Sequence, residues 1–174
     1  KMKILLLSLV LGLVCAEEQQ TILINLSYFS GTWNTIYLAA DNIDKIEEDG
    51  PLRGYVRSVV QDSTGETMSF DFYVKDDGVC QKHTAEGRRI GENQYGLQFR
   101  GENIVELVFA ESDAMMFYVV NVDENGQTTH LTEIIAKGND VSPEESQKFE
   151  EETIKKGIPK ENILKVSNTG NFTI

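Results

Sequence analysis

The chain has 174 residues, of which 40% are hydrophobic and 25% are charged, a composition typical of one globular domain rather than of a disordered or collagen-like chain. Its 28 acidic residues outnumber its 16 basic ones, which gives a formal net charge of −12. This charge argues against nucleic acid and anionic membranes as partners, because both attract clustered positive charge.

The N-terminus has the pattern of a processing signal. Two lysines among the first three residues precede an apolar run at residues 4–14. The run is shorter than the roughly 20 residues of a membrane-spanning helix, and small residues follow it up to Ala16. We therefore predict a secretory signal peptide over residues 1–16, a mature domain over residues 17–174, an extracellular location and no membrane insertion. The alternative is a buried hydrophobic helix.

A series of short segments with alternating apolar residues follows, and turn residues separate the segments. In residues 67–75, for example, every second side chain is large and apolar, including Phe70 and Phe72. Eight strands are predicted, at residues 31–40, 52–61, 67–75, 79–85, 94–100, 104–110, 114–122 and 127–136, and residues 162–166 could add a ninth. Eight strands at about ten-residue spacing with short turns are typical of an antiparallel sandwich or barrel.

The periodicity changes after the last long strand. A helix is predicted over residues 142–156, with Ser142 as N-cap, Pro143 in the first turn and Glu145 as the capping-box partner. Gly157 favours its end. The helix has few apolar residues, so we expect it to lie on the surface of the sheet.

The sequence contains no motif that indicates catalysis, a metal or a cofactor. His83 and His130 are the only histidines, and no spacing links them to Cys80 as metal ligands. Neither a nucleophile motif of the Gly-x-Ser-x-Gly type nor a phosphate loop is present. What remains is a surplus of aromatic residues on strands, which is either ordinary core or the lining of a barrel that holds one small apolar ligand.

Three segments resemble the lipocalins, and in particular their odorant-binding and aphrodisin-like branch. They are Gly31-Thr32-Trp33 with the sequence up to residue 51, the block at residues 118–126, and the block at residues 157–163. The resemblance implies an all-β fold: an eight-stranded antiparallel up-and-down β-barrel with a C-terminal α-helix packed on its flank. It also implies a secreted carrier of small hydrophobic odorants or pheromones, and no enzyme.

The resemblance further implies which side chains line the pocket. The family's inward positions fall on Leu38, Leu52, Phe70, Phe72, Leu97, Phe99, Val105, Leu107, Phe117, Val119 and Leu131. Leu38 has the opposite parity to Trp33, so a bulge must intervene between them. His83 stands where relatives commonly have an apolar residue, which suggests a polar contact to the ligand from this strand; a rim or solvent position is the alternative.

Structural roles also follow from the resemblance. Trp33, after Gly31, is expected to close one end of the barrel, and Lys137 to lie over the Trp33 ring in a cation–π contact. Gly138 is expected to supply the backbone turn toward the helix, which favours a monomer, with a dimer as the alternative.

Two positions invite modification. Asn25, in Asn25-Leu26-Ser27, is a candidate glycosylation site. In many relatives the cysteine that corresponds to Cys80 pairs with a cysteine near the C-terminus, where this chain has Phe172. Removal of Cys15 with the signal peptide would therefore leave Cys80 as a free thiol.

Two other functions remain open at this stage. One is a chemosignal or allergen-like lipocalin that a cell-surface receptor recognises through the protein's own surface. The other, less favoured, is an enzyme of the same fold, which would need a thiol inside the barrel, whereas Cys80 follows a turn.

Overall fold

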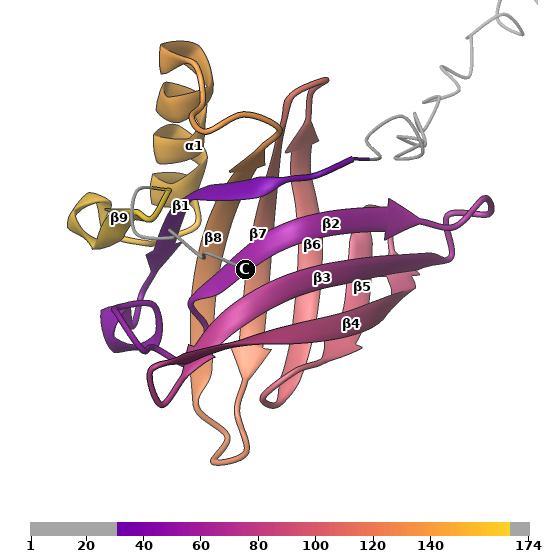
Figure 1. The fold of residues 1–174 in the computed structure, drawn as a ribbon, viewed down its shortest axis with the longest axis horizontal. Coiled ribbons are helices and arrows are strands. Elements are labelled where there is room, and N and C mark those ends of the chain that lie inside the picture. The colour runs from indigo at the N-terminus through magenta and orange to yellow at the C-terminus, as the bar shows by residue number, and fades with distance from the viewer. Residues whose placement is uncertain (1–30, 168–174) are drawn as a thin grey trace, which may run out of the picture.

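The computed structural model describes residues 31–167. They form one antiparallel sheet that curls into a barrel, with strands in the order β2-β3-β4-β5-β6-β7-β8-β1-β9 (Figure 1). The strands are β1 (Asn34–Ala40), β2 (Gly54–Gln61), β3 (Thr67–Asp76), β4 (Val79–Gly91), β5 (Gln94–Gln98), β6 (Glu102–Ala110), β7 (Ala114–Val122), β8 (Thr128–Ala136) and β9 (Ile163–Lys165). The helices are α1 (Pro143–Lys155) and two short 3₁₀ turns, η2 (Ile43–Lys45) and η3 (Lys160–Asn162).

The barrel closes at β1. One edge of this strand pairs with β8, and part of its other edge pairs with β9. Near its start, the chain meets β2 instead: the Trp33 N–H donates to the Arg57 carbonyl at 2.9 Å, and the Val56 N–H donates to Thr35 Oγ1 at 2.8 Å. Strands β2 and β8 are thus both connected to the chain around β1, which closes the barrel.

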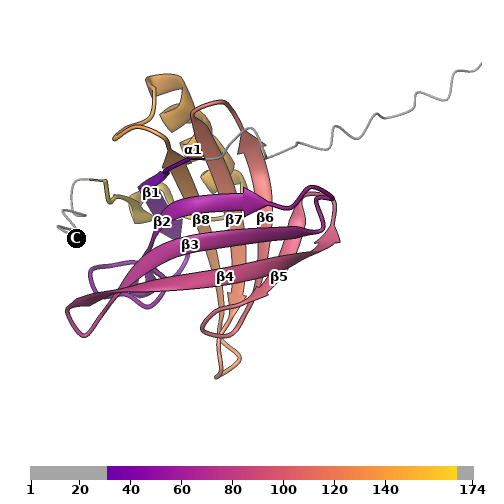
Figure 2. The same cartoon turned by 45° about the vertical axis from the view of Figure 1, so that its right-hand side comes forward.

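Helix α1 packs on the outside of the barrel. Phe149 is buried against Ile134 and Met116, and its ring stacks on Tyr37 at 5.9 Å between centroids. Figures 1 and 2 place α1 against the part of the barrel made by β1, β7 and β8, away from β3 to β5. The predicted flanking helix is therefore confirmed. Its Ser142–Glu145 capping box is formed in both directions.

All eight predicted barrel strands are present, as is the short ninth. The largest difference is β4, which continues to Gly91 rather than ending near Ala85. Its second half carries Ala85 and Gly87 at the positions that turn inward, and a Cβ at Gly87 would lie 3.0 Å from the Tyr95 Cβ. Because the inward residues are small, the apolar alternation that marks the other strands is absent here.

The antiparallel path gives the barrel two different ends. The rim is the end where loop 41–53 meets the β3–β4, β5–β6 and β7–β8 turns. The floor is the end where Trp33 meets the β2–β3, β4–β5 and β6–β7 turns.

The predicted bulge in β1 is present, as an irregularity in the pairing with β8 between Thr35 and Tyr37. Gly138 lies in the bend that follows β8, without a positive φ, and the monomer remains a prediction.

Several sequence predictions lie outside residues 31–167. These are the signal peptide at residues 1–16, the glycosylation site at Asn25 and the role of Phe172.

Candidate ligand-binding site

The barrel interior contains a partly open cavity of about 110 Å³. Since one buried water needs roughly 10–15 Å³, the cavity has room for about ten atoms of water size. Its walls come from β2 to β8 and from the end of loop 41–53. The lining residues are Leu52, Gly54, Val56, Phe70, Phe72, Ala85, Leu97, Phe99, Asn103, Val105, Phe117, Val119, Leu131 and Glu133.

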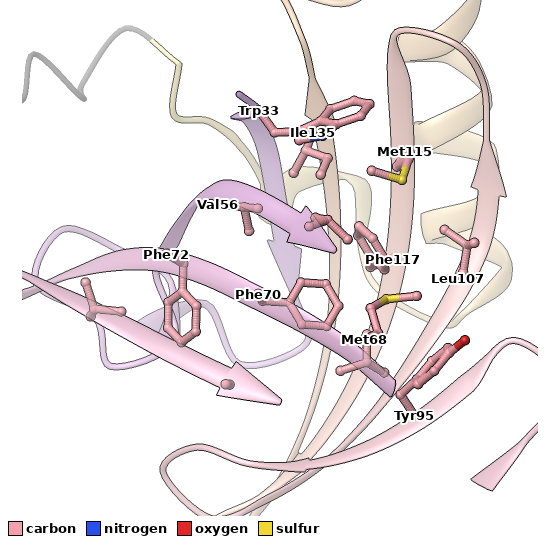
Figure 3. Close-up of a cluster of buried hydrophobic side chains, with 14 residues drawn as sticks. Trp33, Val56, Met68, Phe70, Phe72, Tyr95, Leu107, Met115, Phe117 and Ile135 are labelled. Atoms are coloured by element: carbon pink, nitrogen blue, oxygen red, sulfur yellow. The ribbon is translucent and has the colours of Figure 1, made fainter. Parts of the chain in front are cut away.

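Aromatic rings form much of the wall. Phe70 and Phe117 meet edge to face at 5.5 Å between centroids, and Figure 3 shows both turned into the interior beside Val56. Nearer the rim, Phe72 and Phe99 meet edge to face at 4.8 Å. Such rings supply a large apolar contact area, which favours small apolar molecules over polar ones.

Among the described residues, Asn103 is one of two polar side chains that line the cavity. Its amide nitrogen donates to the Phe99 carbonyl at 2.8 Å, with a longer contact to the Gly101 carbonyl at 3.4 Å. Its oxygen accepts from the Asn121 amide at 2.9 Å. Asn103 therefore holds the β5–β6 turn together, and its hydrogen-bonding groups are already used.

Glu133 is the second polar side chain, and it projects from β8. Its Oε1 accepts a hydrogen bond from the Thr35 hydroxyl at 2.6 Å. The Thr35 oxygen also accepts from the Val56 N–H at 2.8 Å. Burial raises the pKa of the Glu133 carboxyl to about 7, and the Thr35 hydrogen bond offsets this rise only in part. Near neutral pH the group is thus balanced between acid and carboxylate.

Nine of the twelve side chains predicted for the pocket line this cavity; Leu38, His83 and Leu107 do not. Leu38 is fully buried in a cluster beneath loop 41–53 with Ile46 and Val166. Leu107 is buried in the main interior cluster but has no surface on the cavity.

His83 lies beside the cavity rather than in its wall. Its ring stacks on Phe72 at 5.7 Å and meets the edge of Phe99 at 5.2 Å. Its Nε2 is 3.6 Å from Asp76 Oδ2, too long for a hydrogen bond. His83 thus backs the aromatic rings near the rim, which agrees with the alternative given for it.

Five lining residues were missed by the sequence reasoning: Gly54, Val56, Ala85, Asn103 and Glu133. Glu133 has the same strand parity as the predicted Leu131, so alternation alone could have found it. It was not predicted because a charged side chain is ordinarily expected on the outside of a barrel. Gly54 and Ala85 carry no large side chain, so no apolar signal pointed to them.

The floor contains the predicted tryptophan. Trp33 is fully buried and packs in one cluster with Met115 and Ile135 (Figure 3). The Lys137 Nζ lies 5.4 Å from the centre of the Trp33 ring, so the predicted cation–π contact is present. Gly31 is exposed and has φ +129°, a conformation that side chains disfavour.

The rim is held by charged groups on several loops. Arg100 donates from Nη1 to the Pro51 carbonyl at 2.8 Å and from Nη2 to Asp76. The hydrogen bond from Arg100 lowers the pKa of the Asp76 carboxyl, although partial desolvation opposes it. Lys45 pairs with Asp123 at 3.3 Å, which ties loop 41–53 to the β7–β8 turn.

The remaining chemistry-bearing side chains form no second site. Cys80 is an exposed free thiol on the outer part of β4, as expected once a partner is lacking within residues 31–167. No set of three or more His, Cys, Asp or Glu side chains in the described part of the chain is arranged to hold a metal ion. No helix within residues 31–167 is both long and apolar enough to cross a membrane.

An apolar cavity inside an up-and-down barrel with one flanking helix is typical of a class of small-molecule-binding proteins. The family model described as "Lipocalin / cytosolic fatty-acid binding protein family" matches residues 30–170. The chain belongs to this family.

Individual relatives are similar over nearly the whole chain. Lipocalin Cav p 2.0101 of Cavia porcellus is 43% identical over 169 residues, which cover 97% of this chain and 96% of the relative. The crystal structure of aphrodisin, a sex pheromone from female hamster, is 38% identical with a TM-score of 0.80, covering 83% of this chain and 99% of that one. The complex of bovine odorant-binding protein with undecanal is 35% identical with a TM-score of 0.63, covering 86% and 96%.

Proposed function

We propose that this protein is a secreted carrier that binds one small apolar molecule, of the odorant or pheromone kind, in its barrel cavity. The observation that carries the proposal is the barrel cavity of about 110 Å³, whose walls among the described residues are apolar except at Asn103 and Glu133. Burial of apolar ligand surface at roughly 25 cal/mol per Å² supplies binding free energy without any chemical step. The similarity to an odorant-binding protein solved with undecanal supports the same use of the barrel.

The proposal is tested by displacement of a fluorescent apolar probe. We expect 1-aminoanthracene to bind with a stoichiometry of one, and small aldehydes such as octanal to displace it at micromolar concentrations. Phe117→Ala should change the probe affinity, because Phe117 lines the cavity. If no aldehyde, alcohol or aromatic compound displaces the probe, the carrier function is wrong.

Phe109→Ala provides a matched control for that variant. Phe109 is a buried phenylalanine of the neighbouring strand, but it packs in the cluster beneath α1, outside the cavity. The two truncations should both lower the melting temperature, whereas only Phe117→Ala should change the probe affinity. An equal effect of both variants on binding would mean that the probe does not occupy the cavity.

The similarity to aphrodisin, whose structure is described as that of a sex pheromone, supports a second candidate function. In this case a receptor would recognise the outer surface of the protein, with or without cargo. Protein stripped of ligand by organic extraction separates the two candidates: a surface signal keeps its biological response, whereas a carrier loses it until ligand is returned.

A further inference from the structure

One group in the cavity is not explained by the binding of apolar molecules alone. Glu133 is the only ionisable side chain that lines the cavity within residues 31–167. A carboxyl group in an apolar cavity is unfavourable unless it is neutral or paired. Its place in the cavity wall points to a contribution to ligand binding, an inference that rests on the proposed carrier function.

The hydrogen bonds leave one oxygen of Glu133 open to a ligand. Oε1 already accepts from the Thr35 hydroxyl, which in turn accepts from the Val56 N–H. Oε2 has no hydrogen-bond partner among the described residues, and the part of Glu133 that remains accessible faces the cavity. In the geometry observed, where the Thr35 hydroxyl donates to Oε1, the proton of the neutral group is carried by Oε2.

No other cavity group competes for this role. The amide nitrogen of Asn103 donates to the carbonyls of the β5–β6 turn. A neutral Glu133 is therefore the one hydrogen-bond donor that the described cavity wall presents to a ligand.

The surroundings of Glu133 favour its neutral form. In the sheet ladder its neighbours are Leu38 on β1 and Phe117 on β7, and Thr35 on β1 makes its only side-chain hydrogen bond. The cavity walls supplied by β2 to β6 contain no ionisable residue among those described. Burial and the Thr35 hydrogen bond are accordingly the only causes that act on the Glu133 pKa, and no cation balances a charge there.

We propose that neutral Glu133 donates the single specific hydrogen bond of the cavity, and that it selects small apolar ligands carrying one lone-pair acceptor, a carbonyl above all. A carboxylic acid kept neutral by an apolar site is an effective donor to such an oxygen. Ionisation removes the donor and sets two negative oxygens against the carbonyl. Ligands of this class are thus held at and below neutral pH and released as the pH rises.

The hydrogen bond is tested with two ligands of nearly the same shape. Acetophenone carries a carbonyl where α-methylstyrene carries a methylene group, and each has nine non-hydrogen atoms. Because the two ligands also differ in their hydration, the measured quantity is the ratio of their two dissociation constants, compared between variants at pH 6.

Two substitutions separate the donor from the shape of the cavity. Glu133→Gln keeps an N–H donor while its oxygen still accepts from Thr35, so the ratio should stay near that of the wild type. Glu133→Leu removes the donor, so acetophenone should weaken about tenfold relative to α-methylstyrene, the loss expected for one buried hydrogen bond. An unchanged ratio in Glu133→Leu overturns the proposal.

The pH dependence gives an independent result that does not require the leucine variant to fold. Between pH 6 and pH 8 the neutral fraction of the Glu133 carboxyl falls about tenfold, and wild-type affinity for acetophenone should fall with it. Glu133→Gln has no proton to lose, so its affinity should be the same at both values. Equal pH profiles of wild type and Glu133→Gln overturn the proposal.

A third ligand tests the opposite chemistry. 1-Phenylethylamine would pair with the ionised carboxylate, so stronger binding of this amine at pH 8 than of acetophenone at pH 6 would show that Glu133 serves as an acceptor and would overturn the proposal. If both acetophenone and α-methylstyrene displace the probe with the same ratio in every variant, the carrier function stands and only the role of Glu133 fails. If neither ligand displaces it, the carrier function fails as well.

Discussion

Two carboxyl groups of the same barrel, Asp76 at the rim and Glu133 inside, have opposite electrostatic surroundings. Asp76 receives a hydrogen bond from Arg100, which lowers the pKa of its carboxyl. Glu133 has a threonine hydroxyl as its only partner and no nearby cation, and burial raises the pKa of its carboxyl. The rim acid is thus charged at neutral pH, whereas the interior acid is held between its two forms.

The comparison shows that the polar groups at the rim connect loops, whereas the polar group in the interior faces the cavity. At the rim, charged pairs such as Lys45–Asp123 and Lys75–Glu48 join loop 41–53 to its neighbours, and solvent screens them. In the interior, the same kind of side chain faces the space that a ligand would fill. We therefore expect the rim to govern the entry and release of ligands, and the interior to govern which ligands are retained.

The largest effect on stability is expected at the floor, where a tryptophan is fully buried. Trp33→Ala should lower the free energy of unfolding by about 3–5 kcal/mol, because it removes a fully buried ring that packs on Met115 and Ile135. Thermal and urea unfolding measure this change. Trp33→Phe is the control, since it keeps a ring and should lose less. A loss of ligand affinity at unchanged melting temperature would contradict the structural role of Trp33.

The next largest effect is the pH dependence of folding stability that arises from Glu133. The folded-state pKa of Glu133 lies above the ordinary value of 4.5, at about 7, so the folded protein holds this proton more tightly than the unfolded chain. The stabilising contribution is therefore complete below about pH 4.5 and is lost as the pH rises to about 7. Glu133→Gln does not lose it.

We expect Glu133→Gln to be more stable than the wild type by about 3 kcal/mol at pH 8 and to differ much less at pH 4. Chemical unfolding over this pH range measures the difference. Glu124→Gln, on the exposed β7–β8 turn, controls for the loss of one negative charge. A difference that is constant with pH would mean that Glu133 is not held in an apolar environment.

The sequence predicted the strands well because most of them alternate large apolar and polar residues. Strand β3, with Met68, Phe70, Phe72 and Val74 buried, is a clear instance. The second half of β4 escaped detection because close packing against Tyr95 requires Gly87, which carries no apolar side chain. Strand periodicity is thus informative only where the interior is wide enough for large residues.

Most of the cavity lining could also be predicted, and the errors in it have related physical reasons. Family resemblance and alternation indicated the aromatic wall, including Phe70, Phe99 and Phe117, all of which line the cavity. Neither could show that Leu107 is covered by its neighbours, because coverage depends on packing across the barrel. Glu133 was missed because a charged residue is ordinarily expected outside, although its parity with Leu131 placed it within.

A smaller effect on stability is expected at Lys137, whose ammonium group lies over the Trp33 ring. Lys137→Met should lower the free energy of unfolding by about 1 kcal/mol, because the cation–π contact of Lys137 with Trp33 is lost while most of the chain's apolar contact is kept. Thermal unfolding at low and high salt measures it. Lys137→Arg should retain the contact. Equal stability of the methionine variant and the wild type would show that the contact contributes nothing.

The smallest effect on stability is expected at the rim. The main effect of a rim substitution is expected on the rate of ligand release. Arg100→Gln removes the contacts to Asp76 and to the Pro51 carbonyl, which join the β5–β6 turn to the β3–β4 turn and to loop 41–53. The pKa of Asp76 should then rise toward its ordinary value, because the hydrogen bond that lowers it is lost. An NMR titration of this carboxyl measures the rise.

The same variant should release a bound fluorescent probe severalfold faster in stopped-flow displacement, because the rim loops separate more easily. The ratio of acetophenone to α-methylstyrene affinities should not change, since Glu133 lies in another part of the barrel. Lys155→Gln, which removes the ion pair with Glu152 on α1, controls for the loss of one positive charge away from the rim. If Arg100→Gln alters the affinity ratio but not the release rate, the rim takes part in ligand selection and the separation between the two regions is wrong.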